Sequence, residues 1–82
     1  MTDADGVLAA IRDICRAELD DPALAVGETT RFADLRGWDS VAVAGVVMAA
    51  EERFGLRLSS EEIEQAVRVD DLARLVRARR TR

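Results

Sequence analysis

The chain of 82 residues has no histidine, no tyrosine and no lysine, and its only cysteine is Cys15. A catalyst built from this chain alone would have to use carboxylates, arginines and hydroxyls, without the side chains that most often act as bases or Schiff-base amines near neutral pH. We therefore do not expect an enzyme. A metal site is not expected either, because zinc sites need clustered cysteine or histidine ligands.

The single cysteine and the lack of a long apolar run indicate where the protein is located. One cysteine cannot form an internal disulfide, and no apolar run is long enough for a signal peptide or a membrane span. The cytoplasm is the expected location, with no membrane partner. Cys15 falls in an apolar stripe at helical spacing, so we expect it to pack in the core rather than to react.

Charge is unevenly placed along the chain, whose net charge is −4. Residues 1–66 carry 14 of the 16 acidic residues and six of the 12 arginines, whereas residues 67–82 carry two acids and the other six arginines. An acidic body argues against a nucleic-acid surface, which needs a clustered basic patch. The basic end is interpreted as a solvated helix terminus whose cations suit the negative end of the dipole.

Periodicity predicts an all-α fold of four helices in one domain over residues 1–82. The expected ranges are 4–19, 39–54, a short helix near 59–66, and a last helix that opens at 69. Thr2 or Asp3 is available to cap the first helix, and Ser59 with Glu62 forms a capping-box pattern.

The connection between the first two helices is long. Pro22, Gly27 and Gly37 argue against a helix through residues 20–38. Its apolar side chains, at Leu24, Val26, Phe32 and Leu35, predict a loop that folds back over the bundle. Such a loop would bring the residues after it to one end of the bundle.

The most informative motif is Gly37-Trp38-Asp39-Ser40, which joins this loop to the second helix. Asp39 is a good N-cap, because its carboxylate can accept from the unpaired amides of the first turn. Ser40 would then lie where the helix dipole and free N–H groups favour an anion, including a phosphodiester esterified to its hydroxyl.

The second helix is apolar on two sides. One side, made by Val43, Val46, Val47, Ala50 and Phe54, is a natural core face. The other carries Val41, Ala44, Gly45 and Met48, with Glu51 and Glu52 at its rim. This second side is either buried, as in the central helix of a bundle, or an exposed docking strip beside Ser40 with Met48 as an adaptable contact.

Residues 37–63 resemble the acyl carrier proteins, in which an Asp-Ser pair opens the second helix. The resemblance extends over the whole chain and implies a four-helix bundle of that type, with a long first loop and a short third helix. It implies that Ser40 is the attachment site for 4′-phosphopantetheine, which a separate phosphopantetheinyl transferase moves from coenzyme A. Asp39 corresponds to the acidic partner of the motif, and a monomer is the usual form.

The chain departs from the commonest pattern around the docking helix. Val41 stands where leucine is usual, and Ala42 and Gly45 stand where carriers of fatty-acid synthesis have acids. We therefore expect partner docking to involve Trp38, Val41 and Met48.

Charged and aromatic side chains near Ser40 have further expected roles. Glu51 and Glu52 are expected to give electrostatic steering. Trp38 has a second interpretation, in which it pins the loop to the bundle.

The leading hypothesis is a free-standing carrier that holds an acyl thioester in a specialised, polyketide-like pathway of secondary metabolism. Its partners would be the transferase, a loading ligase or acyltransferase, and downstream acyl-processing enzymes. An aminoacyl or peptidyl carrier of a nonribosomal-peptide-type system is the nearest alternative. A helical interaction module, with Ser40 as a simple cap, is a third, and a hydrolase lacks a credible base.

Overall fold

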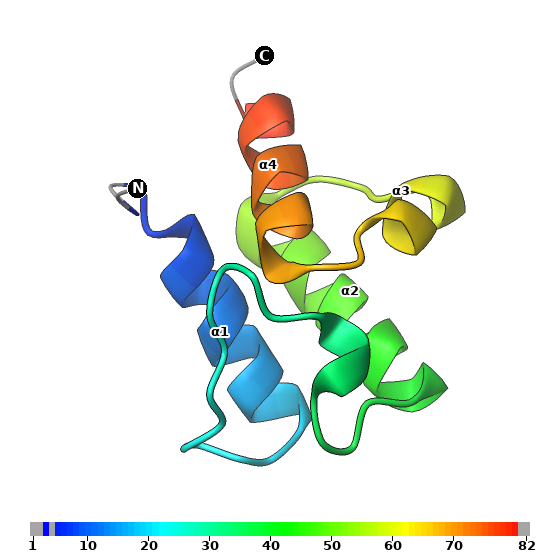
Figure 1. Cartoon of the computed structure of the whole chain (residues 1–82). Coiled ribbons are helices and arrows are strands. Elements are labelled where there is room, and N and C mark those ends of the chain that lie inside the picture. The colour runs from blue at the N-terminus through cyan, green and yellow to red at the C-terminus, as the bar shows by residue number, and fades with distance from the viewer. Residues whose placement is uncertain (1–2, 4, 81–82) are drawn as a thin grey trace.

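A computed structural model describes residue 3 and residues 5–80, and within this part of the chain the fold is helical. The elements are α1 (Val7–Glu18), the 3₁₀ helix η1 (Phe32–Asp34), α2 (Ser40–Phe54), α3 (Ser60–Gln65) and α4 (Val69–Arg80) (Figure 1). The only β pairing among these residues is an isolated antiparallel bridge between Arg31 and Arg68. The predicted all-α fold with a long first loop and a short third helix is confirmed.

The start of α1 differs from the prediction. The helix begins at Val7 because Gly6 adopts a left-handed backbone with φ of 73°. Asp3 nevertheless caps it, since its carboxylate accepts from the N–H groups of Leu8 and Ala9 at 2.8 and 2.9 Å. The alternative cap, Thr2, and the predicted first residue of the helix, Ala4, lie outside the described residues.

The predicted opening of the last helix at residue 69 is confirmed, because α4 begins at Val69, and the starts of α2 and α3 are confirmed by their side-chain hydrogen bonds. Asp39 Oδ1 accepts from the Ala42 N–H at 2.8 Å, so α2 opens at Ser40. Ser59 Oγ accepts from the Glu62 N–H at 3.1 Å, and Glu62 Oε1 accepts from the Ser59 N–H at 2.9 Å. Both caps satisfy backbone donors that the first turn leaves free.

The core lies where α1 packs against α2 and α4. Its buried members are Val7, Ile11, Ile14, Cys15, Phe32, Leu35, Val46, Ala50, Val69, Leu72, Ala73 and Val76. Burial raises the pKa of the Cys15 thiol to about 11, so it stays protonated and unreactive, as predicted for a core cysteine. No helix of the described residues has both the length and the apolar character needed to cross a membrane.

The long loop is fixed to the bundle by side chains and by backbone bonds. Phe32 and Leu35 are buried, and Leu24 and Val26 pack against the core, as predicted. The Phe32 N–H donates to the Val67 carbonyl at 3.0 Å, and the Val69 N–H donates to the Thr30 carbonyl at 2.9 Å. The loop is therefore attached to the segment between α3 and α4 and to the first residue of α4.

The arginines of α4 are not simply solvated, which corrects the interpretation of the basic end. Arg77 pairs with Asp3 at 3.2 Å and with Asp5 at 2.8 Å, and so joins the end of the chain to its beginning. Arg79 pairs with Glu62 of α3. These cations balance acids of the same chain.

The ion pairs predict a loss of stability in acid. Hydrogen bonding to Arg77 lowers the pKa of Asp5 from 3.8 to about 2, and a backbone hydrogen bond from Ser59, together with Arg79, lowers the pKa of Glu62. A carboxyl group whose pKa is lower in the folded state than in the unfolded state stabilises the fold at any pH above its unfolded-state pKa. That contribution is lost as the pH falls from the unfolded-state pKa through the folded-state pKa. We expect a melting temperature that is flat near neutral pH and falls below about pH 4.5.

Thermal unfolding followed by circular dichroism down to about pH 2.5 checks this expectation. In Arg77→Met, the part of the acid loss that belongs to Asp5 should become smaller, and only the contribution of backbone hydrogen bonds, chiefly from the Val7 N–H, to the low pKa of Asp5 should remain. Identical pH profiles for the two proteins would contradict the assignment to this ion pair.

Candidate functional site

The site is built on the turn that precedes α2. Gly37 has φ of 87°, a conformation that costs a residue with a Cβ about 1–2 kcal/mol. The chain then passes through Trp38, whose N–H donates to the Leu35 carbonyl at 3.1 Å, and reaches the extended Asp39. This turn places Ser40 as the first residue of α2, at the end of the helix where the dipole is positive.

The hydroxyl of Ser40 is available for chemistry. Ser40 is exposed, and its side chain makes no hydrogen bond to the described residues. The N–H groups of Ser40 and Val41 are likewise without acceptors in this part of the chain, because the Asp39 carboxylate accepts only from the Ala42 amide. A phosphate bonded to Ser40 would therefore meet free donors and a favourable dipole, so these residues fit a phosphodiester.

Trp38 is held against the loop rather than free. Its ring stacks on Phe32, with centroids 5.2 Å apart and an interplanar angle of 19°. Trp38 is half-buried and packs against the core cluster. This contact favours the interpretation in which Trp38 pins the loop, and its docking role stays a prediction.

The second apolar side of α2 is exposed. Val41 is 78% exposed and Met48 is 68% exposed, and Ala44 between them also faces solvent. The interpretation of this side as buried is therefore wrong. We call Val41, Ala44 and Met48 the exposed strip.

The core side of α2 is rotated from the predicted one. Ala42 is buried along with Val46 and Ala50, whereas Val43 and Val47 are only half-buried.

An acidic side chain lies beside the exposed strip without coming from α2. The carboxylate of Glu18, at the end of α1, lies over Gly45, where a Cβ would collide with it. Sequence reasoning missed this contact, because the two residues are 27 positions apart and only helix packing brings them together. Position 45 of α2 has no acidic side chain of its own, but the Glu18 carboxylate of α1 lies over it.

The two glutamates at the rim have different environments. Glu51 Oε2 accepts from the Leu58 N–H at 2.8 Å, and Glu51 is half-buried. Glu51 therefore fixes the chain after α2. Glu52 is exposed, so it is better placed than Glu51 to attract a partner enzyme electrostatically. The steering prediction remains for Glu52.

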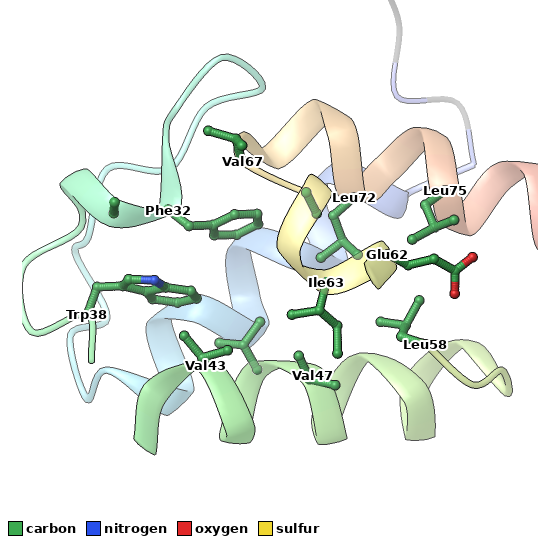
Figure 2. A pocket seen from close by; sticks show the side chains of 13 residues that line it. Phe32, Trp38, Val43, Val47, Leu58, Glu62, Ile63, Val67, Leu72 and Leu75 are labelled. Carbon is green, nitrogen blue, oxygen red and sulfur yellow. The ribbon is translucent and has the colours of Figure 1, made fainter. Parts of the chain in front are cut away.

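A cavity of about 230 Å³ lies between α2, α3, α4 and η1 (Figure 2). The residues that line it are Phe32, Ala33, Trp38, Val43, Val46, Val47, Leu58, Glu62, Ile63, Ala66, Val67, Leu72 and Leu75. Glu62 is the one charged residue among them. No residue spacing in the chain indicates this cavity, which explains why Val43 and Val47 are only half-buried.

The described residues contain no group of histidine, cysteine, aspartate or glutamate side chains that could hold a metal ion.

Comparison with known proteins agrees with this geometry. The family described as "Phosphopantetheine attachment site" matches residues 9–76. An acyl carrier protein of Solidesulfovibrio magneticus is 32% identical over 65 residues, which cover 79% of this chain and 83% of that protein. The chain belongs to the acyl carrier protein family.

Other acyl carriers give similar matches. The acyl carrier protein MbtL of Mycobacterium sp. is 31% identical over 78 residues, which cover 95% of this chain and 88% of that protein. The acyl carrier protein of Wolinella succinogenes is 32% identical over 66 residues, or 80% of this chain and 87% of the relative.

Membership sets what kind of protein this is. It is a carrier with a covalent 4′-phosphopantetheine group, not a catalyst. Carriers of this family work with a phosphopantetheinyl transferase and with acyl-processing enzymes. The absence of histidine and lysine is consistent with this division of labour, because the reacting groups belong to the cofactor and to the partners.

Proposed function

We propose that Ser40 carries the 4′-phosphopantetheine arm as a phosphodiester and that the carrier presents an acyl thioester to partner enzymes. One observation supports this above the others: the unbonded, exposed hydroxyl of Ser40 at the first position of α2. The bound arm supplies a terminal thiol that holds the acyl group in an activated form.

Residues around Ser40 have separate tasks in this proposal. The Ser40 and Val41 amides stabilise the phosphate charge, and the dipole of α2 adds to them. Asp39 fixes the start of the helix through its bond to Ala42, so the attachment point has a defined position. Gly37 permits the turn that exposes it.

We further propose that the carrier serves a specialised, polyketide-like pathway and not general fatty-acid synthesis. The exposed strip supports this part of the proposal. Val41 and Met48 present apolar surface beside Ser40, and α2 has no acid between Ser40 and Ala50, so the acid over this stretch is Glu18 from α1. A loading enzyme and the downstream enzymes would read this strip by shape and apolar contact. The expected setting is a cytoplasmic monomer.

The proposal is tested by intact-protein mass after incubation with coenzyme A, Mg²⁺ and a broad-specificity phosphopantetheinyl transferase. A single phosphopantetheine should be added, and peptide fragmentation should assign it to Ser40. Addition at another residue would overturn the assignment. No addition by several transferases, with the protein folded, would favour a helical interaction module.

Docking through the exposed strip predicts the effect of Met48→Glu. A carboxylate at this position must be desolvated when an apolar partner surface covers it, and truncating or disrupting such a contact typically costs more than 1 kcal/mol. We expect kcat/KM for transfer by partner enzymes, with the transferase as the first assayed, to fall by about fivefold or more. Circular dichroism should stay native, because Met48 is exposed.

Ala25→Glu provides the matched control, because it adds the same charge at an exposed position of the first loop. It should leave kcat/KM close to that of the parent. Equal losses in the two variants would point to net charge rather than to docking on the strip.

A further inference from the structure

The cavity has two distinct ends. Trp38 and Val43, which lie two residues before and three residues after Ser40 in the chain, line one end (Figure 2). Leu58, Leu75 and Glu62 line the other, and the carboxylate of Glu62 points away from Trp38. The space between them runs along α2. A chain that enters beside Ser40 would therefore reach Glu62 last.

The wall made by α3 is weakly fixed by apolar contacts. No residue of α3 is fully buried, and Ile63 and the adjoining Ala66 are only half-buried where they line the cavity. Polar contacts fix its position instead. Arg79 of α4 pairs with Glu62 and also donates to the Arg57 carbonyl at 2.6 Å, so one guanidinium holds both α3 and the segment before it.

Both oxygens of Glu62 are engaged. Oε1 accepts from the Ser59 N–H at 2.9 Å, and Oε2 pairs with Arg79. The carboxylate is therefore already bound to groups of the chain, and the other lining side chains are aliphatic or aromatic. An unbranched apolar chain is therefore the ligand that best fits this cavity.

We propose that the Glu62–Arg79 ion pair closes the far end of the cavity and sets the longest apolar cargo chain that the carrier shelters. The inference rests on the proposed function, since it takes the arm on Ser40 as the source of the chain. Each methylene that enters the apolar part of the cavity stabilises the loaded protein. A chain that reaches the ion pair must separate or desolvate two charges, which opposes further entry.

The test uses a series of acyl groups of increasing length. The transferase installs acyl-phosphopantetheine from hexanoyl- to tetradecanoyl-coenzyme A, intact mass verifies loading, and thermal unfolding gives the melting temperature at each length. In the parent, the melting temperature should rise with chain length and then stop rising. In Arg79→Met, which removes the charge and keeps an apolar stem, the rise should continue for at least one further step of the series.

Two additional variants make the comparison specific. Glu62→Gln can still accept the Ser59 N–H of the capping box but loses the ion pair, so it should shift the limit in the same direction as Arg79→Met. Arg74→Met removes an arginine of the same helix that pairs with Asp71 and does not line the cavity, so it should keep the parent limit.

Hydrogen exchange on the unloaded proteins gives a readout that needs no arm. Amides of α3 should exchange up to about fivefold faster in Arg79→Met than in the parent, and those of α1 should be unchanged. The same chain-length limit in Arg79→Met as in the parent would overturn the inference, as would an equal shift in Arg74→Met.

The proposed function can fail separately from this inference. If Ser40 accepts no arm, mass measurement reports that failure. The inference is then tested by measuring the melting temperature in the presence of free n-alkanols of increasing length. The melting temperature should stop rising at a longer alkanol in Arg79→Met than in the parent. If loading succeeds but the melting temperature is independent of chain length, the cavity does not shelter the cargo, and the inference is wrong while the carrier function stands.

Discussion

Ser40→Ala is expected to accept no phosphopantetheine under conditions that load the parent completely. The reason is chemical, because the substitution removes the oxygen that would form the phosphodiester. The fold should be nearly unaffected, since the Ser40 hydroxyl makes no hydrogen bond within the described residues and Asp39 caps α2. A change of less than about 0.5 kcal/mol in unfolding free energy is expected for such a surface position.

Ser60→Ala is the matched control for this variant. Ser60 is also exposed and is also the first residue of a helix, α3, whose cap is the neighbouring Ser59. It should be loaded as fully as the parent, as measured by intact mass. Partial loading of Ser40→Ala would show a second acceptor, and loss in both variants would show that the assay responds to local stability instead of the acceptor oxygen.

Phe32→Ala is expected to have the largest effect on stability. Phe32 is only 6% exposed, it stacks on Trp38 with the ring centroids 5.2 Å apart, and its ring contributes to one wall of the cavity. Removal of a buried phenyl ring costs about 3–5 kcal/mol. A small domain loses roughly 4–8 °C of melting temperature for each kcal/mol, so a fall of more than about 12 °C is expected.

Urea unfolding of the parent, Phe32→Ala and Phe32→Leu measures this effect. The leucine variant keeps most of the apolar volume and should lose only about 1 kcal/mol. A loss below about 1 kcal/mol for the alanine variant would mean that the loop does not depend on Phe32. In that case the position of Ser40 would have to depend on Leu35 and on the backbone bonds to residues 67 and 69.

Local sequence signals were enough to locate the candidate attachment serine and most helix starts. Asp39 and Ser59 are caps that act over three residues, so their hydrogen bonds depend on little beyond the chain beside them. The apolar periods of α1, α2 and α4 likewise follow from residue spacing. The start of α1 was the exception. Gly6 adopts a left-handed backbone and so delays the helix, although a glycine does not by itself prevent a helix from forming.

The roles of charged side chains were less predictable. Glu51 resembles a free surface acid in sequence, but it bonds to the Leu58 amide seven residues later. Arg77 lies 72 residues from Asp5 and 74 from Asp3, yet it pairs with both. Such contacts depend on how the helices pack, which local spacing does not encode.

The sequence by itself determined the helical fold, the caps, the core position of Cys15 and the serine that opens α2, because each of these follows from short-range spacing and residue chemistry. Only the tertiary structure decided that Val41 and Met48 face solvent, that Glu18 covers Gly45, and that a cavity lined by Glu62 lies between α2, α3 and α4. These features arise where separate helices meet, and the volume left between them is set by the packing of side chains distant in the chain.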